Sequence, residues 1–166
     1  FTATDWEIDR EMMHLNMDAL VHLTKLFLPG MKERGEGGVL NVSSLAAFQP
    51  GPMMALYYAS KAFVQSFSEA LAEEVKSHGV NVTALSPGPV KTDFKIKGST
   101  PETKQTDRTV ALDPEYVARA GYEGLKAGKR VVVPGNLTSI APQLVRLLPR
   151  KTVAKFVRML NGHRLP

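Results

Sequence analysis

Hydrophobic side chains recur at helical spacing over residues 4–29, which predicts a first helix. Thr4 and Glu7 have the spacing of a capping box, in which each side chain satisfies a free backbone amide at the start of a helix. Pro29 and Gly30 are expected to bend or end this helix. The apolar stripe along it consists of Met13, Leu20, Leu23 and Phe27.

Two further helices are predicted, over residues 52–77 and 113–127. Gly79 fits the C-terminal cap of the first of them, because glycine readily adopts the left-handed conformation found there. Asp113 is expected to cap the other, with Pro114 in its first turn. The apolar stripe of the helix over 52–77 consists of Leu56, Ala59, Phe63, Phe67, Leu71 and Val75.

Three short apolar runs, at residues 39–44, 80–85 and 130–133, predict buried strands. Strands that alternate with helices are typical of an α/β fold with a parallel sheet covered on both faces. The polar stretch from 95 to 109 predicts a long loop. Residues 136–166 are expected to form a separate amphipathic helical tail, broken at Pro149, after a domain spanning 1–135.

The composition, 43% hydrophobic and 22% charged, is ordinary for a globular domain. The chain has no cysteine, so a metal site would need histidines and carboxylates. His14, Asp18 and His22 recur every four residues on one helix, but a solvated face explains them better than a metal site does. With no run of 18 apolar residues and no secretion signal, the expected location is the cytoplasm.

The formal net charge is +5, and the excess gathers in the tail. No recognition motif or aromatic platform accompanies this charge, so nucleic-acid binding is not expected. Two interpretations stay open: a helix packed on the core with its cations in water, or a helix that contacts a membrane surface or a partner. The tail cations are Arg146, Arg150, Lys151, Lys155, Arg158 and Arg164.

Tyr57 and Lys61 lie four residues apart, so they share one face of the second helix. A cation beside a phenol favours the phenolate and lowers the tyrosine pKa from its usual value of about 10. Such a tyrosine can donate and accept protons near neutral pH. The spacing by itself is weak evidence, because Tyr122 and Lys126 show it too.

The surroundings of the first pair separate it from the second. Ser44 ends a predicted strand, and the loop after the next strand begins Pro87-Gly88. Ligands of open α/β sheets bind at the carboxyl ends of strands, so these groups are expected at one edge. Asn16 lies on the apolar stripe of the first helix, where a buried amide needs a hydrogen-bond partner.

Four segments together resemble the short-chain dehydrogenase/reductase family over residues 1–135. The resemblance implies the C-terminal part of a Rossmann-like, doubly wound parallel sheet, with about three strands and flanking helices. It also implies interconversion of a carbonyl and an alcohol with NAD or NADP, and a homo-oligomer formed through the first two long helices. The segments are Asn16, Asn41-Val-Ser-Ser44, Tyr57-Tyr-Ala-Ser-Lys61 and Pro87-Gly-Pro-Val-Lys-Thr92.

The resemblance also implies roles for individual residues. Tyr57 would exchange a proton with the substrate oxygen, and Ser44 would hydrogen-bond that oxygen. Lys61 would lower the Tyr57 pKa and bind the nicotinamide ribose, and Asn16 would hold a water that links Lys61 to solvent. The loop at 95–109 would cover the substrate. The implied cofactor-binding residues are Tyr57, Lys61, Pro87, Gly88, Val90 and Thr92.

The chain departs from the family in one respect: no glycine-rich turn follows a strand and opens a helix. The only glycine cluster, Gly35-Glu-Gly-Gly38, precedes a strand instead. At about 30 residues for each βαβ unit, roughly 90 residues of the family pattern are missing. The chain alone is therefore expected to be inactive. The alternative is a catalytically idle module that keeps the fold for interaction or oligomerisation.

Overall fold

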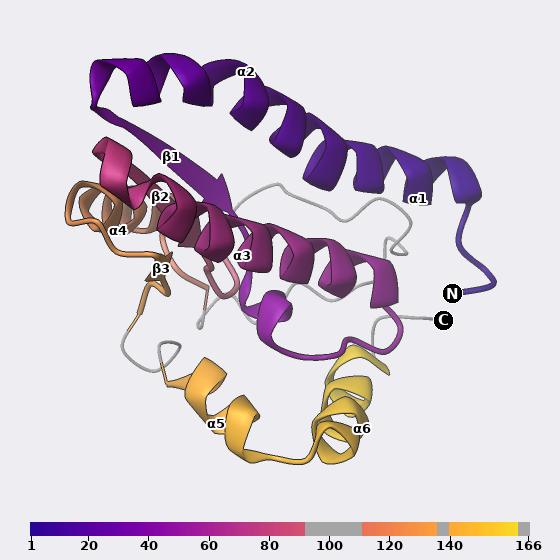
Figure 1. Ribbon diagram of the computed structural model, residues 1–166. Coiled ribbons are helices and arrows are strands. Elements are labelled where there is room, and N and C mark those ends of the chain that lie inside the picture. The colour runs from indigo at the N-terminus through magenta and orange to yellow at the C-terminus, as the bar shows by residue number, and fades with distance from the viewer. Residues whose placement is uncertain (92–110, 136–139, 163–166) are drawn as a thin grey trace.

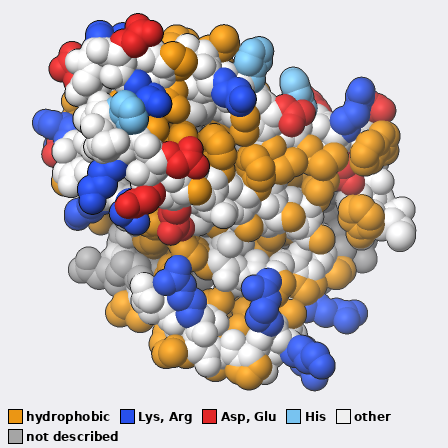
Figure 2. Space-filling model, in the orientation of Figure 1, with side chains coloured by type: hydrophobic (Ala, Val, Ile, Leu, Met, Phe, Trp, Pro, Cys, Tyr) orange, Lys and Arg blue, Asp and Glu red, His pale blue; other side chains and the backbone are white. Residues whose placement is uncertain are grey.

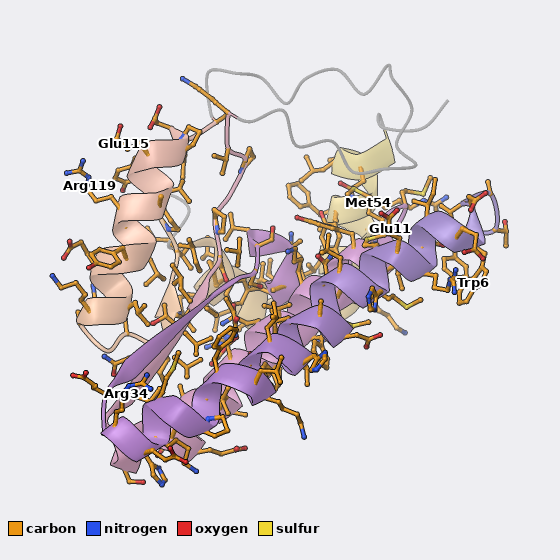
Figure 3. The ribbon with its side chains drawn as sticks, turned by 90° about the horizontal axis from the view of Figure 1, so that it is seen from above. Trp6, Glu11, Arg34, Met54, Glu115 and Arg119 are labelled. Carbon is orange, nitrogen blue, oxygen red and sulfur yellow. The ribbon has the colours of Figure 1, made fainter. Side chains whose placement is uncertain are left out.

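A computed structural model describes residues 1–91, 111–135 and 140–162. The chain begins with α1 (Trp6–Met13), a π-helical turn η1 (His14–Asp18) and α2 (Ala19–Arg34), which run on as one long helix across the top of Figure 1. Seen from above, Trp6 and Arg34 mark its two ends (Figure 3). The later elements are β1 (Gly37–Val42), the 3₁₀ turn η2 (Leu45–Phe48), α3 (Ala55–Val75), the 3₁₀ turn η3 (Lys76–His78), β2 (Val80–Leu85), α4 (Pro114–Lys126), β3 (Val131–Val132), α5 (Ala141–Leu147) and α6 (Arg150–Asn161).

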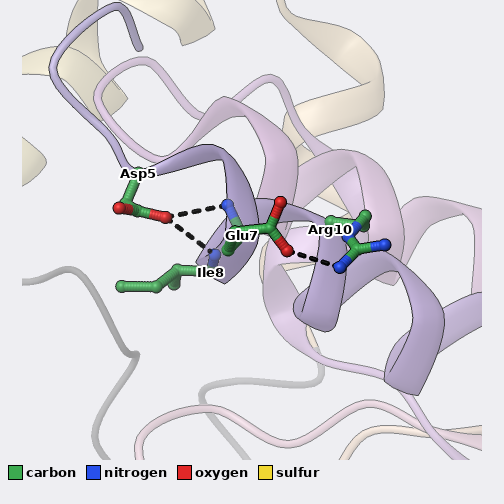
Figure 4. A network of polar contacts seen from close by, with 4 residues as sticks. All are labelled: Asp5, Glu7, Ile8 and Arg10. Carbon is green, nitrogen blue, oxygen red and sulfur yellow. Dashed lines mark hydrogen bonds and ion pairs between the residues drawn. The ribbon is translucent and has the colours of Figure 1, made fainter.

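The start of α1 corrects the predicted capping box. Asp5, not Thr4, is the N-cap, and its carboxylate accepts from the amides of Glu7 at 2.8 Å and Ile8 at 3.3 Å (Figure 4). A carboxylate is the stronger acceptor at the positive end of a helix. Glu7 pairs with Arg10 instead of turning back to the cap.

The long first helix passes through Pro29 and Gly30 and ends at Arg34. Gly35, with φ of 72°, caps it in the left-handed conformation. Of the two predicted outcomes, a bend or an end at Pro29 and Gly30, the structure therefore excludes the end. Most of the predicted stripe is also less buried than expected: Leu23 and Phe27 are 54% and 62% exposed.

The sheet has the order β1-β2-β3, and both strand pairs are parallel. Gly37 pairs with Val80, and Ala84 pairs with Val131. Because side chains alternate along a strand, Val80 and Val82 pack in a core beneath α2 and α3. The opposite face receives α4, where Gly121 lies directly against Leu85.

The buried face of α3 is more polar than its predicted apolar stripe. Phe63 is 39% exposed, whereas Ser60 and Ser68 are at most 1% exposed. Small polar side chains let the helix approach the sheet closely, and each hydroxyl is hydrogen-bonded. Ser68 accepts from the Asn41 amide on β1 at 2.9 Å and donates to the Val64 carbonyl at 2.7 Å.

The tail forms two helices, separated at Leu148 and Pro149 as predicted. Val153 and Val157 of α6 are 5% and 2% exposed, so one side of this helix packs on the body of the protein. Asn161, which is also buried, donates to the Pro52 carbonyl at 3.0 Å and to the Tyr58 hydroxyl at 3.4 Å. Among the described residues, no helix is both long and apolar enough to cross a membrane.

Candidate active site

Lys61 is held through its side chain and its backbone by two consecutive residues. These are Val42, the last residue of β1, and Ser43, which follows it. Its ammonium donates to the Val42 carbonyl at 3.0 Å. Its own backbone carbonyl accepts from the Ser43 hydroxyl at 2.9 Å. Ser43 is 2% exposed and its amide bonds to the Leu85 carbonyl of β2, so it belongs firmly to the sheet. These contacts fix the second turn of α3 at the carboxyl end of β1.

The Lys61 ammonium lies 5.9 Å from the centre of the Tyr57 ring, one helical turn earlier on α3. Burial lowers the pKa of Lys61 from 10.5, because removal of water disfavours the charged form. An ammonium has three donors, and the Val42 carbonyl uses one of them. As far as the described residues go, two donors therefore remain for a ligand at this end of the sheet.

Asn16 reaches the same helix from η1. Its side-chain amide donates to the Ser60 hydroxyl at 3.0 Å, and that hydroxyl donates to the Tyr57 carbonyl at 2.8 Å. These two successive hydrogen bonds explain how a polar residue is accommodated on an apolar helix. Single π-helical turns inside α-helices occur frequently at functional sites, and here the turn carries the residue that contacts the tyrosine segment.

Ser44 caps η2 just beyond β1. Its side-chain oxygen accepts from the Ala46 amide at 3.1 Å. A hydroxyl that accepts still has a proton to donate. Ser44 can therefore give a hydrogen bond to a ligand oxygen while it keeps the backbone turn in place.

The predicted loop after β2 is anchored on both sides. The Pro87 carbonyl accepts from the Leu45 amide at 3.0 Å, which ties it to the turn after Ser44. Val90 forms a parallel bridge with Leu112, just before α4. Gly88 lies between these anchors, and Thr92 and residues 95–109 fall outside the described residues. The structure thus brings Pro87 to the strand end that carries Ser44.

An open groove of about 540 Å³ runs between α2 and β1. Asn16 and Lys61 line it together with Val42 and the apolar side chains Leu20, Leu23 and Phe27. Within the described residues, β1 is an edge strand, so the groove follows the outer edge of the sheet. Of the candidate site residues, Asn16 and Lys61 therefore face this groove.

The second tyrosine–lysine pair, Tyr122 and Lys126, shows that a spacing of four residues does not by itself indicate a functional site. The Lys126 ammonium lies 5.5 Å from the centre of the Tyr122 ring, nearly the distance in the first pair. Tyr122, however, is 58% exposed on the outer side of α4. The first pair differs through its contacts with Val42, Ser43 and Ser60.

His14, Asp18 and His22 were predicted to lie on a solvated face of the first helix, and two of them form a weak contact. His14 Nδ1 lies 3.5 Å from Asp18 Oδ2, and both side chains are well exposed. In the part of the chain that the structure describes, no three such side chains gather in a way that could hold a metal ion.

Sequence reasoning missed Ser43 and Ser60, the two hydroxyls that position the site. Each lies beside a predicted site residue, Ser44 and Lys61 respectively, and serine is common at surfaces. The one available indication was periodicity: Ser60, Val64 and Ser68 recur every four residues on α3. Their hydrogen bonds reach across from other elements, and no local pattern encodes such contacts.

The family model described as short chain dehydrogenase matches residues 1–103 of the chain. Among solved structures, the chain is similar to a short-chain dehydrogenase from Burkholderia cenocepacia in complex with NADP, with a TM-score of 0.73 and 24% sequence identity. The match covers 92% of this chain and 60% of that chain. This likeness confirms the predicted α/β class and the Rossmann-like parallel sheet.

Two curated relatives are more similar in sequence. The very-long-chain 3-oxoacyl-CoA reductase of Anas platyrhynchos is 35% identical over 158 residues, which cover 95% of this chain and 47% of the relative. The 17-beta-hydroxysteroid dehydrogenase type 3 of Mus musculus is 37% identical over 117 residues, which cover 70% of this chain and 38% of the relative. The chain spans less than half the length of either relative.

Proposed function

Because the chain belongs to the short-chain dehydrogenase family, we propose that it carries the proton-transfer part of an NAD(P)-dependent oxidoreductase site. The enzyme would interconvert a carbonyl and an alcohol. The observation that carries this proposal is the position of Lys61, held by Val42 and Ser43 one helical turn from Tyr57. Within the described part of the chain, no such anchor holds the second tyrosine–lysine pair.

In the direction of reduction, the Tyr57 hydroxyl gives its proton to the carbonyl oxygen as negative charge develops there. Ser44 donates a hydrogen bond to the same oxygen and stabilises that charge. The Lys61 ammonium favours the phenolate that Tyr57 becomes. Oxidation of the alcohol runs through the same groups in reverse, with Tyr57 as the base.

The residues present suit the nicotinamide end of the cofactor. Lys61 has two ammonium donors beyond the one that Val42 uses, and ribose hydroxyls accept such donors. Pro87, Gly88 and Val90 lie in a loop anchored at the same sheet end, and Thr92 would follow them. NAD or NADP, when bound, supplies or accepts the hydride. The choice between the two depends on residues that recognise the ribose 2′ position.

The substrate class is suggested by the names of the relatives. One is a reductase of very-long-chain 3-oxoacyl-CoA, and the other is a dehydrogenase of 17-beta-hydroxysteroids. Both names describe an oxygen function on a large apolar group, a very long acyl chain or a steroid. We therefore propose a 3-oxoacyl thioester or a steroid ketone as the substrate of the whole enzyme.

Residues 1–166 alone are proposed to be inactive. The groove along β1 leaves Asn16 and Lys61 beside an uncovered strand edge. A doubly wound sheet that holds a dinucleotide needs further strands and a glycine-rich turn, and the described part contains neither. Joined to those elements, the same residues would form a complete site.

A specific observation favours assembly through the first two long helices as a second function. Leu26 and Phe27 of α2 are 61% and 62% exposed, and Phe63 of α3 is 39% exposed. Apolar side chains that face water on neighbouring helices suit an interface between copies. Light scattering of Leu26→Asp would test this, with a smaller mass expected than for the unchanged chain.

The test of the oxidoreductase proposal uses the whole enzyme with a 3-oxoacyl-CoA and NADPH or NADH. Tyr57→Phe removes the proton donor and should lower the rate of carbonyl reduction by about 10²–10⁴-fold. Tyr122→Phe is the matched control and should leave the rate unchanged. Equal rates for Tyr57→Phe and the unchanged enzyme would overturn the role of Tyr57.

A further inference from the structure

The side chains of α6 divide into three bands. At about 100° for each residue, Val153, Val157 and Asn161 fall on one side, and all three are buried against the body of the protein. The outward side carries two further bands next to each other. Lys151, Lys155 and Arg158 form a basic band, and Phe156, Met159 and Leu160 form an apolar band that is more than half exposed.

Helix α5 extends the same surface. Leu144 and Leu147 are 56% and 81% exposed, and Leu148, just after the helix, is 51% exposed. From residue 141 to 162 the sequence contains no aspartate or glutamate. Figure 2 shows cationic and hydrophobic side chains side by side over α5 and α6, at the bottom of the view.

We propose that this surface of α5 and α6 binds the face of an anionic lipid bilayer. Phe156, Met159 and Leu160 would enter the boundary between headgroups and acyl chains. The cations of the neighbouring band would remain at the level of the phosphates and carboxylates, which attract them. A helix that only covers a core accounts for the buried band and for cations in water, but it leaves the exposed apolar band unexplained.

The surface is held firmly enough to act as a docking face. Asn161 anchors the end of α6 to the Pro52 carbonyl and the Tyr58 hydroxyl. Val153 and Val157 hold the rest of the helix. The outward bands of α6 are therefore presented in a fixed orientation relative to the body of the protein.

The composition of the surface argues against other occupants. Nucleic-acid sites combine cations with several stacking aromatic groups, whereas Phe156 is the one aromatic residue between 141 and 162 and its neighbours are Met159 and Leu160. A second copy of the chain would need to offer an acidic and apolar groove, and the groove along β1 has no acidic residue in its lining. An anionic bilayer supplies both the charge and the apolar layer.

The experiment is co-sedimentation of the 166-residue chain with phosphatidylcholine vesicles that contain phosphatidylserine. Binding is expected with these vesicles, weaker binding with phosphatidylcholine alone, and less binding as salt is added. The double variant Lys151→Glu, Lys155→Glu should bind at least about tenfold less. The control pair Lys126→Glu, Lys129→Glu, with the same change of charge on α4 and just after it, should bind like the unchanged chain.

A probe on the helix locates the contact. Because the chain has no cysteine, Thr152→Cys allows a single environment-sensitive dye on the outward side of α6. Its emission should shift to the blue with anionic vesicles, whereas a dye at Ser77→Cys, near the far end of α3, should not shift.

Circular dichroism of each variant checks that the helices are retained; every substituted residue is exposed. No sedimentation with anionic vesicles, or equal loss in both charge pairs, would overturn the proposal. A blue shift at Ser77 equal to that at Thr152 would do the same, and so would tighter binding to duplex DNA than to the vesicles. None of these variants alters Tyr57 or Lys61, so failure here leaves the oxidoreductase proposal untouched.

Discussion

Asn16 and Ser60 lie 44 residues apart in the chain, and the side-chain amide of the first donates to the hydroxyl of the second over 3.0 Å. The Ser60 hydroxyl in turn donates a hydrogen bond to the carbonyl of Tyr57. The π-helical turn on the first long helix is thus joined to the turn of α3 that carries the candidate proton donor. Ser60 acts here as a positioning residue.

Ser60→Ala should destabilise the chain by about 1–3 kcal/mol, because it removes the hydroxyl to which the Asn16 amide donates. Urea unfolding measures this change. Ser77→Ala, which alters an exposed hydroxyl on η3, should have little effect. In a double-mutant cycle, Asn16→Ala and Ser60→Ala should be coupled. Additive effects of the two would show that the hydrogen bond does not contribute.

The pH dependence of Lys61 follows from its burial, which lowers its pKa from 10.5. The folded chain holds this proton more weakly than the unfolded chain does. Between the folded and unfolded pKa values, the unfolded state therefore binds more protons, and stability rises with pH through this group. At pH values below the folded-state pKa of Lys61, burial of the charged ammonium lowers the free energy of unfolding by its full amount.

Two measurements test this. The ¹³Cε resonance of Lys61 should titrate with a midpoint below 10.5, and Lys61→Met should flatten the alkaline rise of stability. Lys126→Met, on the exposed face of α4, should leave that rise as it is. A Lys61 midpoint at or above 10.5 would contradict the effect of burial.

The cap of α1 offers a direct comparison of two residues. Asp5→Ala removes the acceptor of two backbone amides and should cost about 0.5–2 kcal/mol in the free energy of unfolding. Glu7→Ala removes only an exposed ion pair with Arg10 and should cost less. If Glu7→Ala were as damaging as Asp5→Ala, the capping box predicted from the sequence would be correct after all.

Gly51 is needed because the ring of Tyr58 fills the space beside it. A Cβ at residue 51 would lie 2.1 Å from a ring carbon, so Gly51→Ala should destabilise the chain by about 1–3 kcal/mol. The strain should also weaken the contact between Tyr58 and Asn161, which a protease assay of the tail would reveal. Gly162→Ala, with nothing within 4 Å, is the control. Unchanged stability of Gly51→Ala would show that Tyr58 moves away freely.

Local patterns predicted some elements better than others. The strand at 80–85 and the helix capped by Asp113 were predicted within a residue or two, because a short β-branched run and an N-cap act over neighbouring residues. The stripe on α3 was predicted less well. Apolar periodicity pointed to Phe63, whereas close packing on the sheet selected Ser60 and Ser68, whose polar groups find partners on other elements.

The sequence by itself determined the order of helices and strands, the parallel α/β class and the ordered motifs around Tyr57 and Lys61, because these depend on residue type and spacing. Only the tertiary structure decided what holds each tyrosine–lysine pair in place. Both pairs have nearly the same local geometry, and one of them meets Val42 and Ser43 at the end of β1. Contacts between distant segments arise from the packing of whole elements, and a spacing of four residues cannot specify them.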